Sequence, residues 1–225
     1  MKVILTFVLV LCLCYGVKSK CVMKSECHLV NGFPRNCRYN GTAVPVLNDD
    51  LSGEQKEDAI RIMLLRCPEL TLDENGQIKP YNEIVACCDY AQLRGMADNL
   101  LLAEGVLGRC PTCLRNFVRQ ICELNCSPDQ ARFVDIDTLP LEDGREYVEE
   151  VYYRMHEDFM DNAFDSCSGV IVPQTGLPAV NLMCGNAPVC NSSAWFGFTG
   201  DITNNPLAPV QVNFLRTQTI EDSAY

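Results

Sequence analysis

The chain contains 225 residues, with 29 acidic and 18 basic side chains and a formal net charge of −11. This charge argues against nucleic acid and anionic membrane surfaces as partners, because both are themselves negative. It does not identify a partner, since many secreted and lysosomal proteins are acidic.

The N-terminus has the pattern of a secretory signal peptide. Lys2 precedes an apolar run, and small residues occupy the −3 and −1 positions of a cleavage site after Ser19. The run is shorter than the ~20 residues that a membrane span needs. We therefore expect residues 1–19 to be a signal peptide and residues 20–225 to form one cysteine-rich domain. Loss of Lys2 and Lys18 changes the formal charge to −13.

The first part of the mature chain combines turns with one clear helix. Residues 20–50 are rich in cysteine and turn residues, and we expect mainly loops there. A capping box formed by Ser52 and Gln55 begins a helix that ends at Cys67. Short strands are expected at residues 38–39 and 43–47, and a turn at Asn75-Gly76.

Two apolar helices follow, and each has one buried stripe. The helix that begins at Asp89 repeats apolar residues every three or four positions until Gly105 and Gly108. The next helix begins at Pro111 and ends before Pro128. The remaining expected elements are a strand at 133–136, a helix at 142–167, a loop at 168–181, a short aromatic element at 195–198 and a strand at 210–214.

Thirteen cysteines remain after the signal peptide, and in a secreted chain they predict a disulfide framework. Thirteen is odd, so one thiol has no partner within these residues. Oxidised cysteines are not metal ligands, so we expect no metal site. Sequons at Asn40 and Asn191 predict N-glycosylation, whereas the sequon at Asn125 contains a cysteine expected to be bridged.

No arrangement of residues predicts catalysis. The chain has only two histidines, His28 and His156, and neither belongs to a catalytic signature. Cys87-Cys88-Asp89 is superficially similar to secreted phospholipases, but their His-Asp pair is absent. Cys110-Pro111-Thr112-Cys113 is similar to a redox motif, but no strand leads into it, so a structural bridge is expected. We expect a protein that is not an enzyme and has no cofactor.

A binding module is therefore the default class. The two apolar helices could form the wall of a pocket, but their periodicity alone favours a closed core. Gln92 completes a capping box with Asp89, which gives it a purely structural explanation. Asn36 likewise fits an ordinary turn before Cys37. The residue pattern alone leaves these alternatives open.

A resemblance to a known family rests on six motifs that occur in order. They are CVMKSEC (21–27), RNCRYNG (35–41), CCDYAQL (87–93), DNL (98–100), CPTC (110–113) and CELNCSP (122–128). With this cysteine spacing, the chain resembles the N-terminal luminal domain of the Niemann–Pick type C protein 1 family. The likeness covers nearly the whole mature chain, although residues 128–180 match mainly through Cys167 and a helical pattern.

The resemblance implies an α+β fold with several helices around a small mixed β-sheet and a deep apolar pocket. It implies that a sterol enters hydroxyl first and is held by Asn36 and Gln92. An amide both donates and accepts hydrogen bonds, so it suits a hydroxyl without the desolvation cost of a charge. The implied pocket wall consists of Met23, Glu26, Met96, Asn99, Ile121, Leu182, Met183, Pro206 and Leu207.

The family also implies the cysteine pairing. The implied bridges are Cys21–Cys87, Cys27–Cys37, Cys67–Cys122, Cys88–Cys126, Cys113–Cys167 and Cys184–Cys190. Cys110 is expected to pair beyond Tyr225, so that the chain is a piece of a polytopic membrane protein. The implied partners are a sterol, a soluble carrier similar to Niemann–Pick type C protein 2, and the membrane portion of the parent protein. The implied location is the lumen of late endosomes and lysosomes, or the extracellular face of an absorptive cell.

Some residues depart from the vertebrate pattern of the family. Met23 stands in place of an aromatic residue, Gly95 in place of Thr, and Ile121 and Leu207 in place of Phe. These smaller or more flexible walls leave the preferred sterol open, and bulkier plant-type side chains are one hypothesis. Two other classes also stay open. One is a carrier similar to the folate and riboflavin carriers, which the lone Trp195 fits poorly; the other is an ectodomain without a pocket.

Overall fold

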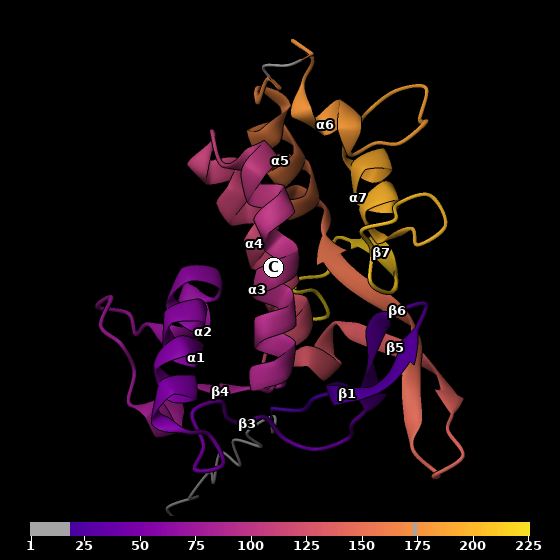
Figure 1. Ribbon diagram of the computed structural model, residues 1–225. Helices are drawn as coiled ribbons and strands as arrows, with labels where there is room; N and C mark the ends of the chain where they lie inside the picture. Colours follow the sequence, from indigo (N-terminus) through magenta and orange to yellow (C-terminus); the bar gives the residue numbers. More distant parts are fainter. Residues whose placement is uncertain (1–18, 173–174) are drawn as a thin grey trace, which may run out of the picture.

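The computed structural model describes residues 19–172 and 175–225 (Figure 1). The predicted signal peptide therefore lies outside the described residues, apart from Ser19. The described chain combines helices with a mixed sheet, so the expected α+β class is confirmed.

The main sheet has the strand order β1-β2-β6-β5, and β7 also pairs with β6. The strands are β1 Met23–Val30, β2 Phe33–Arg38, β5 Val134–Pro140, β6 Glu146–His156 and β7 Gln211–Thr217. β7 runs parallel to β6, while the other pairs are antiparallel. β6 is thus the central strand. A separate ribbon joins β3 Val44–Pro45 to β4 Val85–Ala86.

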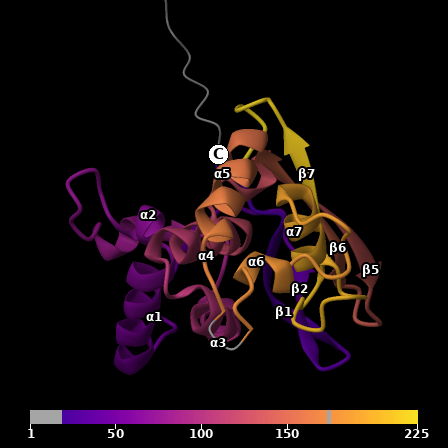
Figure 2. The same ribbon diagram turned by 90° about the horizontal axis from the view of Figure 1, so that it is seen from above.

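The helices are arranged around the long central helix α3. They are α1 Gly53–Arg66, α2 Pro68–Thr71, α3 Tyr90–Leu107, α4 Pro111–Cys126, α5 Glu157–Ser168, α6 Ala179–Leu182 and α7 Ser192–Gly200, with 3-10 turns at Tyr81–Glu83 and Gln130–Arg132. α3 lies between α1 and the sheet, as two views at right angles show (Figures 1 and 2). α4 packs on α3 and α5, and α7 packs on α5 and β7. No helix among the described residues combines the length and apolarity needed to cross a bilayer.

The predicted starts of α1, α3 and α4 are confirmed. Ser52 caps α1 and Asp89 caps α3, and both caps are reciprocal boxes with Gln55 and Gln92. Such caps satisfy backbone N–H groups that have no partner inside the helix. α3 continues past the expected break at Gly105 and ends at Leu107, with Gly108 as its C-cap.

The expected helix at 142–167 is wrong in its first half. Residues 146–156 form β6, and α5 begins only at Glu157. Val151, Tyr153 and Met155 alternate along the strand and are fully buried. Val148, Val151, Tyr152 and Met155 also recur at helical spacing, but β-branched and aromatic residues pack well on a pleated surface, and β6 has neighbours on both sides.

Residues 20–50 contain more strand than expected, because β1 and β2 form a hairpin there. Asn31 and Gly32 make its two-residue turn, with φ angles of 53° and 84°. Asn-Gly is the pair that favours a turn with two positive φ angles, so this hairpin had a recognisable signal.

Six disulfides pair the cysteines in the way that the resemblance implies. Cys21–Cys87 joins the residues just before β1 to the residues before α3, and Cys88–Cys126 joins the latter to the end of α4. Within the described part of the chain, Cys110 forms no disulfide. The bridges therefore hold the start of α3, the end of α4 and β1 together at one point.

Candidate ligand-binding cavity

An elongated cavity of about 460 Å³ lies between the helix pair α3–α4 and the sheet. Its volume is in the range of small-molecule sites, roughly 300–1,000 Å³. α3 lines it from Gln92 to Val106, and a rise of about 1.5 Å per residue makes that stretch roughly 20 Å long. α4 contributes Ile121, and the sheet contributes Val151 and Phe214. The wall is predominantly apolar.

The two ends of the cavity differ in exposure. Met23 and Gln92 line one end, and they are 3% and 5% exposed. Leu102, Leu182 and Leu207 line the other end, and each is more than half exposed. The cavity thus has a closed end near the start of α3 and an open end near α6.

Several polar side chains along the cavity are already paired within the protein. Asn125 Nδ2 donates to the Ile121 carbonyl at 2.8 Å, and Thr199 Oγ1 donates to the Trp195 carbonyl at 2.8 Å. Asn205 Nδ2 donates to the Thr199 carbonyl at 3.1 Å. These groups add little unmet hydrogen-bonding capacity to the wall.

Gln92 is different, because its amide is only half satisfied. Its Oε1 accepts from the backbone N–H of Ser25 at 2.7 Å and of Asp89 at 3.0 Å. Its Nε2 is buried and has no partner among the described residues. A buried donor without a partner is costly, so this nitrogen marks a place where a ligand atom would be stabilised.

Asn36 lies on β2 at the same end of the cavity. The only hydrogen bond of its side chain among the described residues is a weak one, from Nδ2 to Met23 Sδ at 3.5 Å. Its carbonyl oxygen accepts none, and the residue is half-buried. Asn36 therefore offers a free acceptor to a group in the cavity.

Glu26 faces Asn36 in the β1–β2 register and also lines the cavity. Desolvation raises the pKa of its carboxyl, and the charge of Asp89 raises that pKa further. The closed end thus contains two incompletely paired amides, and the exposed Glu26 on its border has a carboxyl group that is more easily protonated than usual.

The structure gathers the predicted ligand-binding residues with one exception. Asn36, Gln92 and the predicted wall residues border the cavity, except for Pro206. Its neighbours Asn205 and Leu207 do so instead. The expectation for Pro206 therefore fails by one position in a loop.

Much of the wall was not predicted from the sequence. Phe117, Val151, Val212 and Phe214 line the cavity, and their periodicity indicated only buried faces. Periodicity distinguishes inside from outside, but it does not distinguish a cavity wall from closed core. Arg35 was also missed. It is 6% exposed, its Nε and Nη1 have no partner among the described residues, and burial lowers the pKa of its guanidinium.

Trp195 belongs to the core and does not line the cavity. It is fully buried, with its ring 5.9 Å from Phe117 and 4.9 Å from Phe196 between centroids. A carrier of flat heterocycles needs aromatic faces in its pocket. Phe117, Phe198 and Phe214 line the cavity instead, so the position of Trp195 does not decide this alternative.

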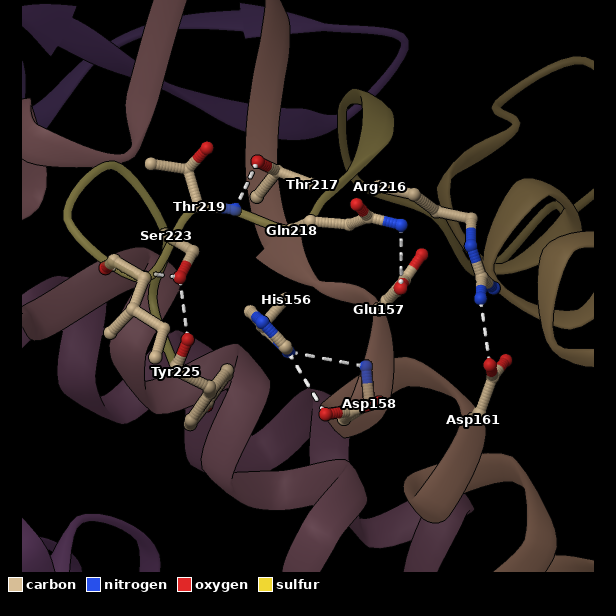
Figure 3. Close-up of polar contacts among 11 residues, drawn as sticks. His156, Glu157, Asp158, Asp161, Arg216, Thr217, Gln218, Thr219, Ser223 and Tyr225 are labelled. Carbon is tan, nitrogen blue, oxygen red and sulfur yellow. Dashed lines mark hydrogen bonds and ion pairs between the residues drawn. The ribbon is translucent and has the colours of Figure 1, made fainter.

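The histidines have structural surroundings. His156 ends β6 and caps α5, since its Nδ1 accepts from the Asp158 N–H at 3.3 Å (Figure 3). His28 packs its ring on Tyr147, with centroids 4.5 Å apart. Among the residues that the structure describes, no group of three or more His, Cys, Asp or Glu side chains is placed to hold a metal ion.

The two predicted glycosylation sites are exposed. Asn40 follows β2, and Asn191 is the N-cap of α7, where its Oδ1 accepts from the Ala194 N–H at 2.9 Å. The cap leaves the Asn191 Nδ2 free, which is the atom that carries a glycan. Glycosylation of both residues stays a prediction.

The fold and the cavity define a disulfide-rich α+β domain with an apolar, one-ended pocket. Comparison with known proteins adds a family: the model of the Niemann-Pick C1 N terminus matches residues 18–224. The chain belongs to this family.

The relatives it resembles are much longer. It is 34% identical over 165 residues to NPC intracellular cholesterol transporter 1 homolog 1b of Drosophila melanogaster, covering 72% of this chain and 13% of that protein. It is 30% identical over 198 residues to NPC intracellular cholesterol transporter 1 of Sus scrofa, covering 84% of this chain and 14% of that protein. It is 30% identical over 225 residues to NPC intracellular cholesterol transporter 1 homolog 1 of Caenorhabditis elegans, covering 92% of this chain and 15% of that protein. These names describe transporters and not enzymes.

Proposed function

We propose that this chain binds cholesterol or a related sterol in the cavity, with the sterol hydroxyl at the closed end. The observation that carries this proposal is the pairing of a long apolar wall with the half-satisfied amides of Gln92 and Asn36. A sterol is a rigid hydrocarbon with one hydroxyl, so it needs an apolar tunnel and few polar groups. Its aliphatic tail would lie near Leu182 and Leu207.

We further propose that the domain serves sterol transport or uptake within a longer protein. Membership in the Niemann-Pick C1 N-terminal family and the names of the relatives support this proposal. The domain would receive sterol from a soluble carrier similar to Niemann–Pick type C protein 2 and pass it toward the membrane portion of its parent. Its place would be the lumen of late endosomes or lysosomes, or the extracellular face of an absorptive cell.

Equilibrium binding of radiolabelled cholesterol to the mature domain tests the binding proposal. Asn36→Ala removes a free amide at the closed end, and Asn125→Ala removes a lining amide that is already paired with the backbone. We expect saturable binding to the wild type and a loss of roughly 1–3 kcal/mol in Asn36→Ala, about tenfold to a hundredfold in affinity. Asn125→Ala should bind within about threefold of the wild type, because its amide has no role toward the ligand.

Absence of saturable sterol binding to the folded wild type would contradict the proposed function. Equal affinity of Asn36→Ala and the wild type would contradict the assignment of the hydroxyl site. The cavity would then serve another apolar ligand, or the hydroxyl would lie elsewhere in it.

A further inference from the structure

The orientation of the Gln92 amide is fixed by two backbone donors. Its Oε1 accepts from the N–H of Asp89 and from the N–H of Ser25, which occupies both lone pairs of a carbonyl oxygen. The reverse orientation would place the NH₂ group against two N–H donors. The hydrogen-bond network therefore permits only the orientation with Oε1 toward the backbone and Nε2 away from it.

Ser25 provides one of these donors from an uncommon backbone conformation. Its φ angle is 60°, in the left-handed region that non-glycine residues seldom adopt. It lies at a bulge, where the register of β1 against β2 shifts between Lys24 and Glu26. Bulges are frequent beside functional sites, where they redirect the chain. This bulge links β1 to the side chain that caps α3.

We propose that Gln92 acts toward the sterol as a hydrogen-bond donor only, and that Ser25 is the positioning residue that sets this polarity. The proposal rests on the proposed function. Nε2 is buried and has no partner among the described residues, so a sterol oxygen would accept its hydrogen. The hydroxyl hydrogen would then go to the free carbonyl oxygen of Asn36. The two amides thus have opposite roles.

This division of roles predicts the affinity of the domain for a sterol with a ketone at C3, relative to the alcohol. A 3-ketone has an acceptor oxygen and no hydrogen to donate, so it keeps the bond from Gln92 and loses the bond to Asn36. The ketone should bind more weakly than the alcohol, but it should still bind. If Gln92 instead accepted from the sterol, the ketone would face two acceptors and bind very poorly.

Competition binding with 5α-cholestan-3β-ol and 5α-cholestan-3-one, which differ only at C3, tests the donor role. In the wild type we expect the ketone to bind about tenfold more weakly than the alcohol. Asn36→Ala should remove this preference. Gln92→Glu keeps an acceptor for both backbone N–H groups but replaces the donor by an acceptor. Its ratio of alcohol to ketone affinity should therefore be at least about tenfold larger than that of the wild type.

Three outcomes would overturn the donor role. They are rejection of the ketone by the wild type more than about a hundredfold, an unchanged preference in Asn36→Ala, or an unchanged preference in Gln92→Glu. Each is distinguishable from failure of the proposed function, because that failure would abolish binding of the alcohol to the wild type.

Ser25 is tested with a matched pair of variants. Ser25→Gly keeps the N–H and accepts a positive φ, so its ratio of alcohol to ketone affinity should equal that of the wild type. Ser25→Pro removes the N–H and cannot adopt this φ, so the ratio should change at least about threefold. Thermal unfolding of each variant shows that the fold is intact. A changed ratio in Ser25→Gly, or an unchanged ratio in folded Ser25→Pro, would refute the positioning role.

Discussion

Under the proposed function, Gln92 combines two roles that the sequence presented as alternatives. Its carbonyl oxygen completes the capping box of α3, and its amide nitrogen has no partner at the closed end of the cavity. Each role uses a different atom of the same amide, so the cap does not compete with the ligand. The cap also fixes where the free nitrogen lies, which helps to preorganise the site.

Glu26 gives the site a predicted pH dependence. Its raised pKa arises mainly from desolvation and secondly from Asp89, and a bound sterol would remove more water from it. Sterol binding then favours the protonated carboxyl, so affinity should increase as the pH falls through the pKa of Glu26. Cholesterol titrations over a descending pH series that starts at neutral pH test this direction.

Glu26→Gln is the control for this pH dependence. The amide is neutral at every pH, so the variant should bind cholesterol with a flat profile, near the affinity of the wild type at low pH. A flat profile in the wild type, or the same slope in Glu26→Gln, would show that Glu26 does not titrate with binding.

Among the elements, β6 shows most clearly where the sequence was insufficient. Its apolar residues satisfy a helical and an alternating period together, and local spacing does not choose between them. The choice comes from pairing with β5, which precedes β6 across a short loop, and with β2 and β7, which are distant in sequence. The capped helices α1 and α3 were predictable, because their signals are local.

α7 packs closely on β7. Alanine substitutions at two of its glycines distinguish the effect of packing against β7 from the effect of helix propensity. A Cβ at Gly200 would overlap the Val212 carbonyl oxygen, whereas a Cβ at Gly197 would meet nothing within 4 Å. Gly200→Ala should destabilise the domain by about 1–3 kcal/mol through overpacking. Gly197→Ala should be neutral or stabilising by up to about 1 kcal/mol.

Urea unfolding with intact disulfides, monitored by the fluorescence of Trp195, measures both changes. Equal stability of the two variants would mean that α7 does not approach β7 as closely as the structure shows. Gly200 also lines the cavity, so Gly200→Ala should weaken sterol binding as well.

At the scale of the whole molecule, the disulfides differ in the length of chain that they close. Cys67–Cys122 joins residues 55 apart, and Cys184–Cys190 joins residues 6 apart. Closing a longer loop removes more entropy from the unfolded chain. Replacing Cys67 and Cys122 by serine should cost about 4 kcal/mol, against about 2 kcal/mol for Cys184 and Cys190.

Denaturant unfolding of the two double-serine variants gives this comparison directly. A larger loss for the short loop would indicate that the segment near α6 contributes more through native contacts than through loop closure. Sterol affinity should change more in the short-loop variant, because Leu182 and Met183 line the open end of the cavity beside Cys184.

The cavity itself could be expected only through the family resemblance. Its wall joins β1, β2, α3, α4, β6, α6 and β7, and the mutual placement of these elements depends on long-range pairing and on the bridges. The motifs around Asn36 and Gln92 located the closed end, because they contain the cysteines that hold it. The apolar wall formed by Val151, Val212 and Phe214 has the same sequence pattern as closed core, so no local signal identified it.

The orientation of the sterol is the central claim, and competition with modified sterols tests it most directly. Labelled cholesterol on the mature domain would be competed with cholesteryl methyl ether, which blocks the hydroxyl, and with a sterol that is alkylated on its side chain. The proposed orientation puts the hydroxyl at the closed end and the tail at the open end. It predicts that the alkylated sterol competes within about tenfold of cholesterol and that the ether competes at least about tenfold more weakly than the alkylated sterol. Strong competition by the ether together with rejection of the alkylated sterol would contradict the account.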